Sequence, residues 1–218
     1  MATTNEIIAQ QVILVAKNIN VGAFSQYWFM KNGVFGGEEF LEDSVFTPGL
    51  TVVSTKECQL MILPDQVRFG LKIDDLTHGE EYAALKLGAF FKAVTDVKIE
   101  AVGLNFVIRI IDPDRSTGQL SRDLFHRKDT NLGGYFSHDD AYFGAYISQN
   151  HDANTRLKLD IKPVHTMNGE TVTEFLMASF NFHRDIIVKE DLQQALLEQL
   201  AKWHEFVETS MKVSCLLS

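Results

Sequence analysis

Histidine and carboxylate side chains gather in the second half of the chain, and these residue types are common metal ligands. His138, Asp139 and Asp140 precede a predicted strand, and His151 and Asp152 follow it. A segment of about nine residues extends roughly 30 Å, at about 3.3 Å per residue. The two groups therefore cannot share one metal ion.

Later strands that run back and forth return further histidines to these two ends, which gives two candidate clusters. One contains His138, Asp140 and His165, and the other contains His151, Asp152, His183 and Asp185. A metal site needs several ligands at about 2.0–2.2 Å from one ion, and neither cluster has a His-x-x-x-His spacing. We therefore favour no metal site and expect no cofactor, and we keep the two clusters as the alternative.

The other chemical motifs are incomplete. The glycines in Gly33-Val34-Phe35-Gly36-Gly37 and at Gly133-Gly134 lack the Lys-Ser/Thr of a phosphate-binding loop. No serine lies in a Gly-x-Ser-x-Gly turn. Cys58 has no histidine nearby in the sequence, which favours a packing role over that of a nucleophile. The sequence leaves enzymatic activity uncertain and leans against it.

The segment Cys215-Leu216-Leu217-Ser218 matches the pattern of a prenylation signal. No polybasic stretch precedes it, so the simpler interpretation is the frayed end of a helix. We expect no contact with a membrane unless Cys215 is prenylated.

Composition narrows the class of protein. The 218 residues are 45% hydrophobic and 22% charged, with a net charge of −9, which is ordinary for a globular protein. No apolar run is long enough for a transmembrane helix, and residues 1–10 do not have the features of a secretory signal. We therefore expect a cytoplasmic protein. Its acidic balance disfavours nonspecific binding to nucleic acid.

Hydrophobic periodicity predicts an α+β fold. The first helix is expected over 21–31 with Asn20 as its N-cap, and the second from a Thr77-His78-Gly79-Glu80 capping box to about Asp96. The third is expected over 119–127, with Gly133-Gly134 as a break. The fourth is expected over 189–213, with Glu190 and Asp191 in its first turn. Strands are expected over 12–16, 44–54, 57–63, 67–73, 99–111, 142–148, 156–164 and 171–182.

The order of these elements is β-α-β-β-β-α, and it occurs twice. At offsets of 96–97 residues, Phe29 falls on Phe125 and Gly36-Gly37 falls on Gly133-Gly134. We interpret the pattern as a tandem pseudo-repeat, with halves at about 8–96 and 98–213. Antiparallel sheets covered by helices would then form a single two-lobed domain over 1–218.

Phenylalanines near the seams of the repeat, together with the apolar stripe of the last helix, suggest an interface. The candidate residues are Phe35, Phe40, Phe136, Trp203 and Val207. We expect a non-catalytic binding or assembly subunit that forms homo- or hetero-oligomers through protein–protein contacts. The alternative is a metal-dependent or small-molecule enzyme that uses a His/Asp cluster at a sheet end, and the second alternative is a nucleic-acid-associated protein.

Overall fold

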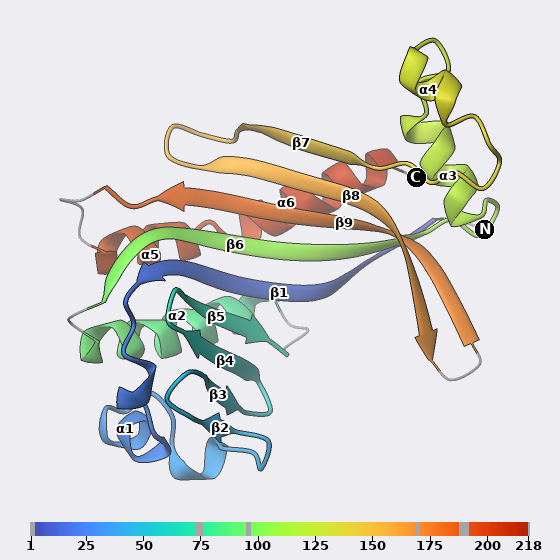
Figure 1. Cartoon of the computed structure of the whole chain (residues 1–218). Helices are drawn as coiled ribbons and strands as arrows, with labels where there is room; N and C mark the ends of the chain where they lie inside the picture. Colours follow the sequence, from blue (N-terminus) through green and yellow to red (C-terminus); the bar gives the residue numbers. More distant parts are fainter. Residues whose placement is uncertain (1–2, 73–75, 95–96, 169–170, 188–191, 218) are drawn as a thin grey trace.

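The fold is built on one long antiparallel sheet (Figure 1). The computed structural model describes residues 3–72, 76–94, 97–168, 171–187 and 192–217. Nine strands follow the order β2-β3-β4-β5-β1-β6-β9-β8-β7, and every neighbouring pair is antiparallel. The α+β class expected from the sequence is confirmed.

The two halves of the chain meet in the sheet at β1 (Thr4–Lys17) and β6 (Lys98–Ile111), which pair with each other. Val12 and Leu14 of β1 are buried, as are Leu104 and Phe106 of β6. Successive side chains of a strand point to opposite faces, so these residues define an inner face of the sheet. The strand predicted over 12–16 is longer, because the residues from Thr4 onward also pair with β6.

The first half supplies β2 (Val45–Phe46), β3 (Thr51–Ser54), β4 (Cys58–Leu63) and β5 (Gln66–Leu71). The single strand predicted over 44–54 is wrong, because a turn separates β2 from β3. Thr47 closes this turn, since its hydroxyl oxygen accepts from the N–H of Leu50 at 3.0 Å.

The second half supplies β7 (Ala145–Asn150), β8 (Arg156–Asn168) and β9 (Thr171–Asp185). All three were expected from the sequence, but β8 and β9 continue beyond the apolar segments. They pair from Arg156↔His183 to Asn168↔Thr171.

Three helices outside the β6–β7 connection contact the sheet or each other. They are α2 (Leu76–Ala93), α5 (Leu192–Leu200) and α6 (Trp203–Ser214). Helices α5 and α6 contact β6, and α2 contacts β5 and α5. In Figure 1 they lie behind the strands. Among the described residues, no helix is long and apolar enough to cross a membrane.

The long helix predicted over 189–213 is two helices. A turn at Ala201-Lys202 separates them, because the N–H of Lys202 donates to the carbonyl oxygen of Gln199, three residues earlier, at 3.2 Å. Helix α6 then begins at Trp203, whose side chain is fully buried. The capping box predicted at Thr77 is wrong, because α2 already includes Leu76 and Thr77 therefore lies inside the helix. Asp96 and the predicted first turn at Glu190 and Asp191 lie outside the described residues.

The helix predicted over 21–31 is also divided, into a 3-10 turn η1 (Val21–Ala23) and α1 (Gln26–Lys31). Asn20 makes no side-chain cap. Instead, Ser25 Oγ accepts from the N–H of Trp28 at 3.2 Å and starts α1. A second 3-10 turn, η2 (Gly37–Glu39), follows, and a third, η3 (Cys215–Leu217), comes after α6.

The connection from β6 to β7 contains α3 (Thr117–Phe125) and α4 (Asn131–Tyr135). Gly133-Gly134 lies inside α4, so the prediction that it breaks a helix is wrong. Thr130 caps α4 by accepting from the N–H of Gly133 at 3.0 Å. We call residues 117–144 the α3–α4 arm. Its α3 contacts β8 and β9, and its α4 projects beyond the sheet at the upper right of Figure 1.

The core continues through both halves along the inner face. In the second half, Trp203 meets Phe106 edge-on, with ring centroids 5.3 Å apart, and Phe206 stacks on Phe182 at 4.1 Å. In the first half, Phe29 packs against Phe24 and other rings. Most of the phenylalanines therefore serve packing.

Candidate functional site

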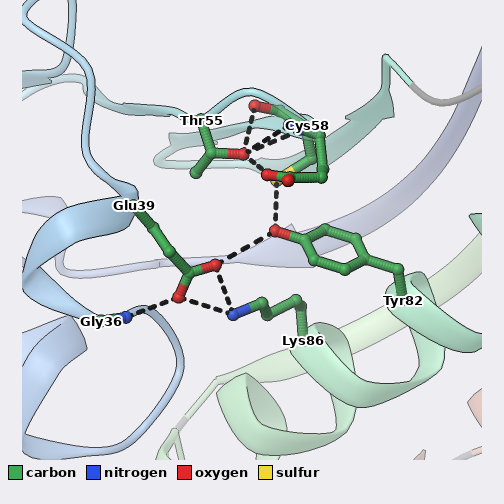
Figure 2. Close-up of polar contacts among 7 residues, drawn as sticks. Gly36, Glu39, Thr55, Cys58, Tyr82 and Lys86 are labelled. Carbon is green, nitrogen blue, oxygen red and sulfur yellow. Dashed lines mark hydrogen bonds and ion pairs between the residues drawn. The ribbon is translucent and has the colours of Figure 1, made fainter.

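A polar network joins α2 to β4 and to the η2 turn (Figure 2). Lys86 Nζ donates to both carboxylate oxygens of Glu39, at 2.7 and 2.9 Å. The N–H of Gly36 donates to Glu39 Oε2 at 2.6 Å. Phe35 lies under the ammonium group, 4.9 Å from Nζ to the ring centroid. The carboxylate and its counter-ion are therefore mutually satisfied.

The same network reaches a buried thiol. Tyr82 Oη lies 3.4 Å from Glu39 Oε1 and 3.9 Å from Cys58 Sγ. Thr55 Oγ1 accepts from the N–H of Cys58 at 2.9 Å and lies 3.5 Å from its sulfur. These contacts connect β4 to the preceding turn and to α2.

The protonation states of this network argue against catalysis. Burial raises the pKa of the Cys58 thiol, and burial likewise raises the pKa of Tyr82. Burial also opposes ionisation of Glu39, but hydrogen bonds from Lys86 and Gly36 outweigh it and lower the pKa of this carboxyl. At neutral pH, Cys58 is a thiol, Tyr82 is a phenol, and Glu39 is an ionised carboxylate whose charge is balanced by Lys86. Since the reactive nucleophile is the thiolate, we interpret the network as a structural tie.

The structure places the first His/Asp cluster in two separate pairs. His138 Nδ1 lies 2.8 Å from Asp140 Oδ1, in the exposed loop before β7. His165 is on β8, where its Nδ1 lies 3.0 Å from Glu174 Oε1 on β9. His165 therefore has a carboxylate partner other than Asp140.

The second cluster is likewise divided among separate partners. His151 Nε2 lies 2.8 Å from Glu205 Oε1 of α6, and His183 Nε2 lies 3.1 Å from Asp185 Oδ1. Asp152 pairs with Lys202 at 2.6 Å. Across the described ranges, no three His, Cys, Asp or Glu side chains are placed to hold a metal ion.

Part of the second cluster nevertheless shares a cavity of about 380 Å³ at the end of β8 and β9. Its lining includes Asn150, Asp152, Arg156, His183 and Asp185. Burial opposes ionisation of Asp152, but hydrogen bonds from Lys202 and from the N–H groups of Asn154 and Thr155 lower its pKa to about 2. Asp152 is thus an anion at neutral pH, paired with Lys202.

The five candidate interface residues have different environments. Phe35, Trp203 and Val207 are buried in the core of the single chain, and Phe40 is half-buried. Phe136 is 48% exposed at the end of α4. In the folded chain, the candidate interface is therefore reduced to Phe136 and the exposed part of Phe40.

Two exposed regions were not recognised from the sequence. One consists of Leu132 and Tyr135 at the apolar end of the α3–α4 arm, which flank the two glycines next to Phe136, the one side chain of this end that was expected at an interface from the sequence. The adjacent aromatics Tyr135 and Phe136 in a polar segment are a signal that could have indicated it. The other is β7, which the strand order places at one edge of the sheet. No local sequence signal identifies an edge strand.

No protein-family model matches the chain, and no curated protein is significantly similar to it.

Proposed function

We propose that the chain is a non-catalytic cytoplasmic subunit that acts by binding protein through the α3–α4 arm. The observation that carries this proposal is the apolar end of the arm. Leu132 is 70% exposed and Tyr135 is 83% exposed, beside the partly exposed Phe136. The rings of Tyr135 and Phe136 lie 5.1 Å apart, so the three side chains offer one contact surface.

Such a surface has the composition of an interface core. Aromatic residues are enriched in the buried centre of protein interfaces, and charged residues occupy the rim. The arm carries charges of both signs, including the pairs Arg127–Asp129 and Arg122–Asp139. A partner that covers the apolar end would leave these pairs at the edge of the contact.

The second element of the proposal is that the fold arose by duplication of one β-α-β-β-β-α unit with helices on one face. The neighbours run β1-β5-β4-β3 in one half and β6-β9-β8-β7 in the other, which supports equivalent topology. The paired strands β1 and β6 are antiparallel, and Gln11 lies opposite Asn105. A pseudo-twofold axis near this pair would relate the two halves. In this arrangement the arm occupies the place of α1 and its following turn.

Site-specific photo-crosslinking tests the binding function. A photo-reactive phenylalanine derivative replaces Tyr135 in one variant and Tyr27 in the control, in the native cells. Tyr27 is 72% exposed but lies on α1, away from the arm. We expect a discrete crosslinked protein from position 135 and none from position 27. Equal crosslinking at both positions, or none at position 135, contradicts the proposal.

A second candidate function is that of a small-molecule enzyme at the 380 Å³ cavity. The specific observation is the His183–Asp185 pair, because a carboxylate orients an imidazole for general acid–base catalysis. A metabolite panel tested by thermal shift on the wild type and on His183→Gln distinguishes this function. A compound that raises the melting temperature of the wild type but not of His183→Gln favours the enzyme. If no compound in the panel does so, the binding subunit is favoured.

A further inference from the structure

We propose that edge strand β7 binds an acidic, extended segment of a partner protein, which adds to the sheet as a further strand. This inference rests on the proposed binding function and names the chemistry of the partner. It is carried by three observations: the unprotected edge, the exposed side chains on both of its faces, and an arginine that lies across it.

Strand β7 lacks the features that usually protect an edge. Its residues, Ala145 to Asn150, include no charged residue and no proline. Edge strands expose unpaired N–H and C=O groups, and proteins commonly block them with charge, proline or very short length. The opposite edge has such protection, because β2 is only two residues long. One edge of the sheet is thus closed to strand addition and the other is open (Figure 1).

Both faces of β7 offer side-chain contacts to an added strand. Tyr146 is 66% exposed and pairs in register with Asp160 of β8, and Ile147 is 48% exposed and pairs with Leu159. Because successive side chains alternate, Tyr146 lies on the outer face and Ile147 on the inner face. An added strand would cover both residues. In strand addition, backbone hydrogen bonds supply affinity and such side-chain contacts supply specificity.

Arg156 gives this edge its charge preference. Its side chain reaches from β8 across β7, where Nε donates to Ser148 Oγ at 2.7 Å and Nη1 donates to Asn150 Oδ1 at 3.0 Å. In the described part of the chain, no carboxylate pairs with Arg156 or with Lys158, the next outer-face residue of β8. A guanidinium group held only by neutral acceptors retains capacity for a bidentate carboxylate contact.

The local charge contrasts with that of the whole molecule. The chain carries a net charge of −9, whereas the outer face of β8 presents Arg156, Lys158 and Lys162 with Asp160 as the one acid. An acidic segment is the complementary partner for this strip. In a pairing of two copies of the chain, the second β7 would bring no carboxylate, and the Arg156 of its β8 would add another positive charge. Self-pairing is therefore disfavoured. Nucleic acid would meet the cations but would not use the strand edge.

Peptide selection with the full chain provides the test. A random library of 12-residue peptides on phage is selected against the wild-type protein, and the enriched peptides are measured by fluorescence anisotropy. The variants are Arg156→Gln and Lys158→Gln, and Arg68→Gln is the matched control. Arg68 is exposed and, like Arg156, bonds a neutral acceptor, Gln66 Oε1, but it lies on β5. Melting temperatures verify that each variant is folded.

We expect peptides in which Asp or Glu alternates with β-branched or aromatic residues. Arg156→Gln should weaken their binding by about tenfold or more, as expected for loss of a charged hydrogen bond, and Arg68→Gln should leave it unchanged. Bound peptide should slow amide hydrogen exchange in residues 145–150. Enrichment of neutral or basic peptides, no enrichment, or unchanged exchange in β7 overturns the proposal.

Two further outcomes identify another occupant and also overturn it. A concentration-dependent dimer in light scattering that Ile147→Asp abolishes assigns the edge to a second copy. If oligothymidine displaces the peptides, and Arg156→Gln weakens oligothymidine binding as much as peptide binding, the strip is assigned to nucleic acid. If the peptides fail while crosslinking at position 135 persists, the binding function stands and only the edge-strand proposal falls.

Discussion

Lys86 Nζ lies within 2.9 Å of both carboxylate oxygens of Glu39, so one ammonium group bridges the η2 turn and α2. The two side chains are mostly buried. The pair is the electrostatic centre of the network that also contains Tyr82 and Cys58, and it predicts how stability depends on pH.

The Glu39→Gln variant should be less stable than the wild type by about 2 kcal/mol at pH 7, because it removes a charged hydrogen-bond partner from Lys86. Since the folded-state pKa of Glu39 is lowered from 4.5, its contribution is fully present above the unfolded pKa. It is lost as the pH falls through the folded pKa. Urea unfolding at pH 7 and pH 3 should show this difference shrinking. The exposed Glu42→Gln is the control, and a pH-independent difference would exclude the ion pair as its cause.

The Trp203→Ala variant should lose about 3–5 kcal/mol of stability, as expected when a large aromatic side chain is removed from a core. Trp203 is fully buried against Phe106. Its indole N–H has no hydrogen-bond partner among the described residues, so Trp203→Phe should cost less. Urea unfolding measures both changes, with Tyr27→Ala as the exposed control. A Trp203→Ala variant as stable as the wild type would contradict the assignment of Trp203 to the core.

The two cysteines should react at very different rates. Cys58 is buried with a raised pKa, and Cys215 is exposed. Ellman's reagent should therefore modify one thiol per chain in the native protein and two in urea. Cys215→Ser should abolish the native reaction, whereas Cys58→Ser should leave it. Rapid native modification of Cys58 would show that the network opens.

Substitution of two adjacent glycines should separate their roles in α4. A Cβ at Gly133 would lie 1.9 Å from the carbonyl oxygen of Arg127, whereas one at Gly134 meets no atom within 4 Å. Gly133→Ala should displace α4 and increase proteolytic cleavage in the arm, and Gly134→Ala should not. If Gly133→Ala also removes crosslinking from position 135, the shape of the arm is required for binding. Equal cleavage in the two variants would exclude the close approach at Gly133.

The sequence determined the local elements where apolar side chains recur at a clear period. Alternation through Val67 and Phe69 indicated β5, and the stripe through Leu196, Trp203 and Val207 indicated the buried side of the last helices. These patterns succeed because a strand or helix in contact with a core must bury one face. They do not show which element lies opposite, and they missed the tightened turn at Ala201-Lys202.

Tertiary structure alone decided the environment of the candidate site residues. His165 pairs with Glu174 because β8 and β9 bring these side chains opposite each other, and His151 meets Glu205 because α6 packs beside it. Phe35 is buried while Phe136 is exposed, although both residues are phenylalanines that follow a glycine-containing segment. The strand order also decided that β7 is an edge. Such pairings join residues far apart in the sequence, and hydrophobic periodicity carries no information about their partners.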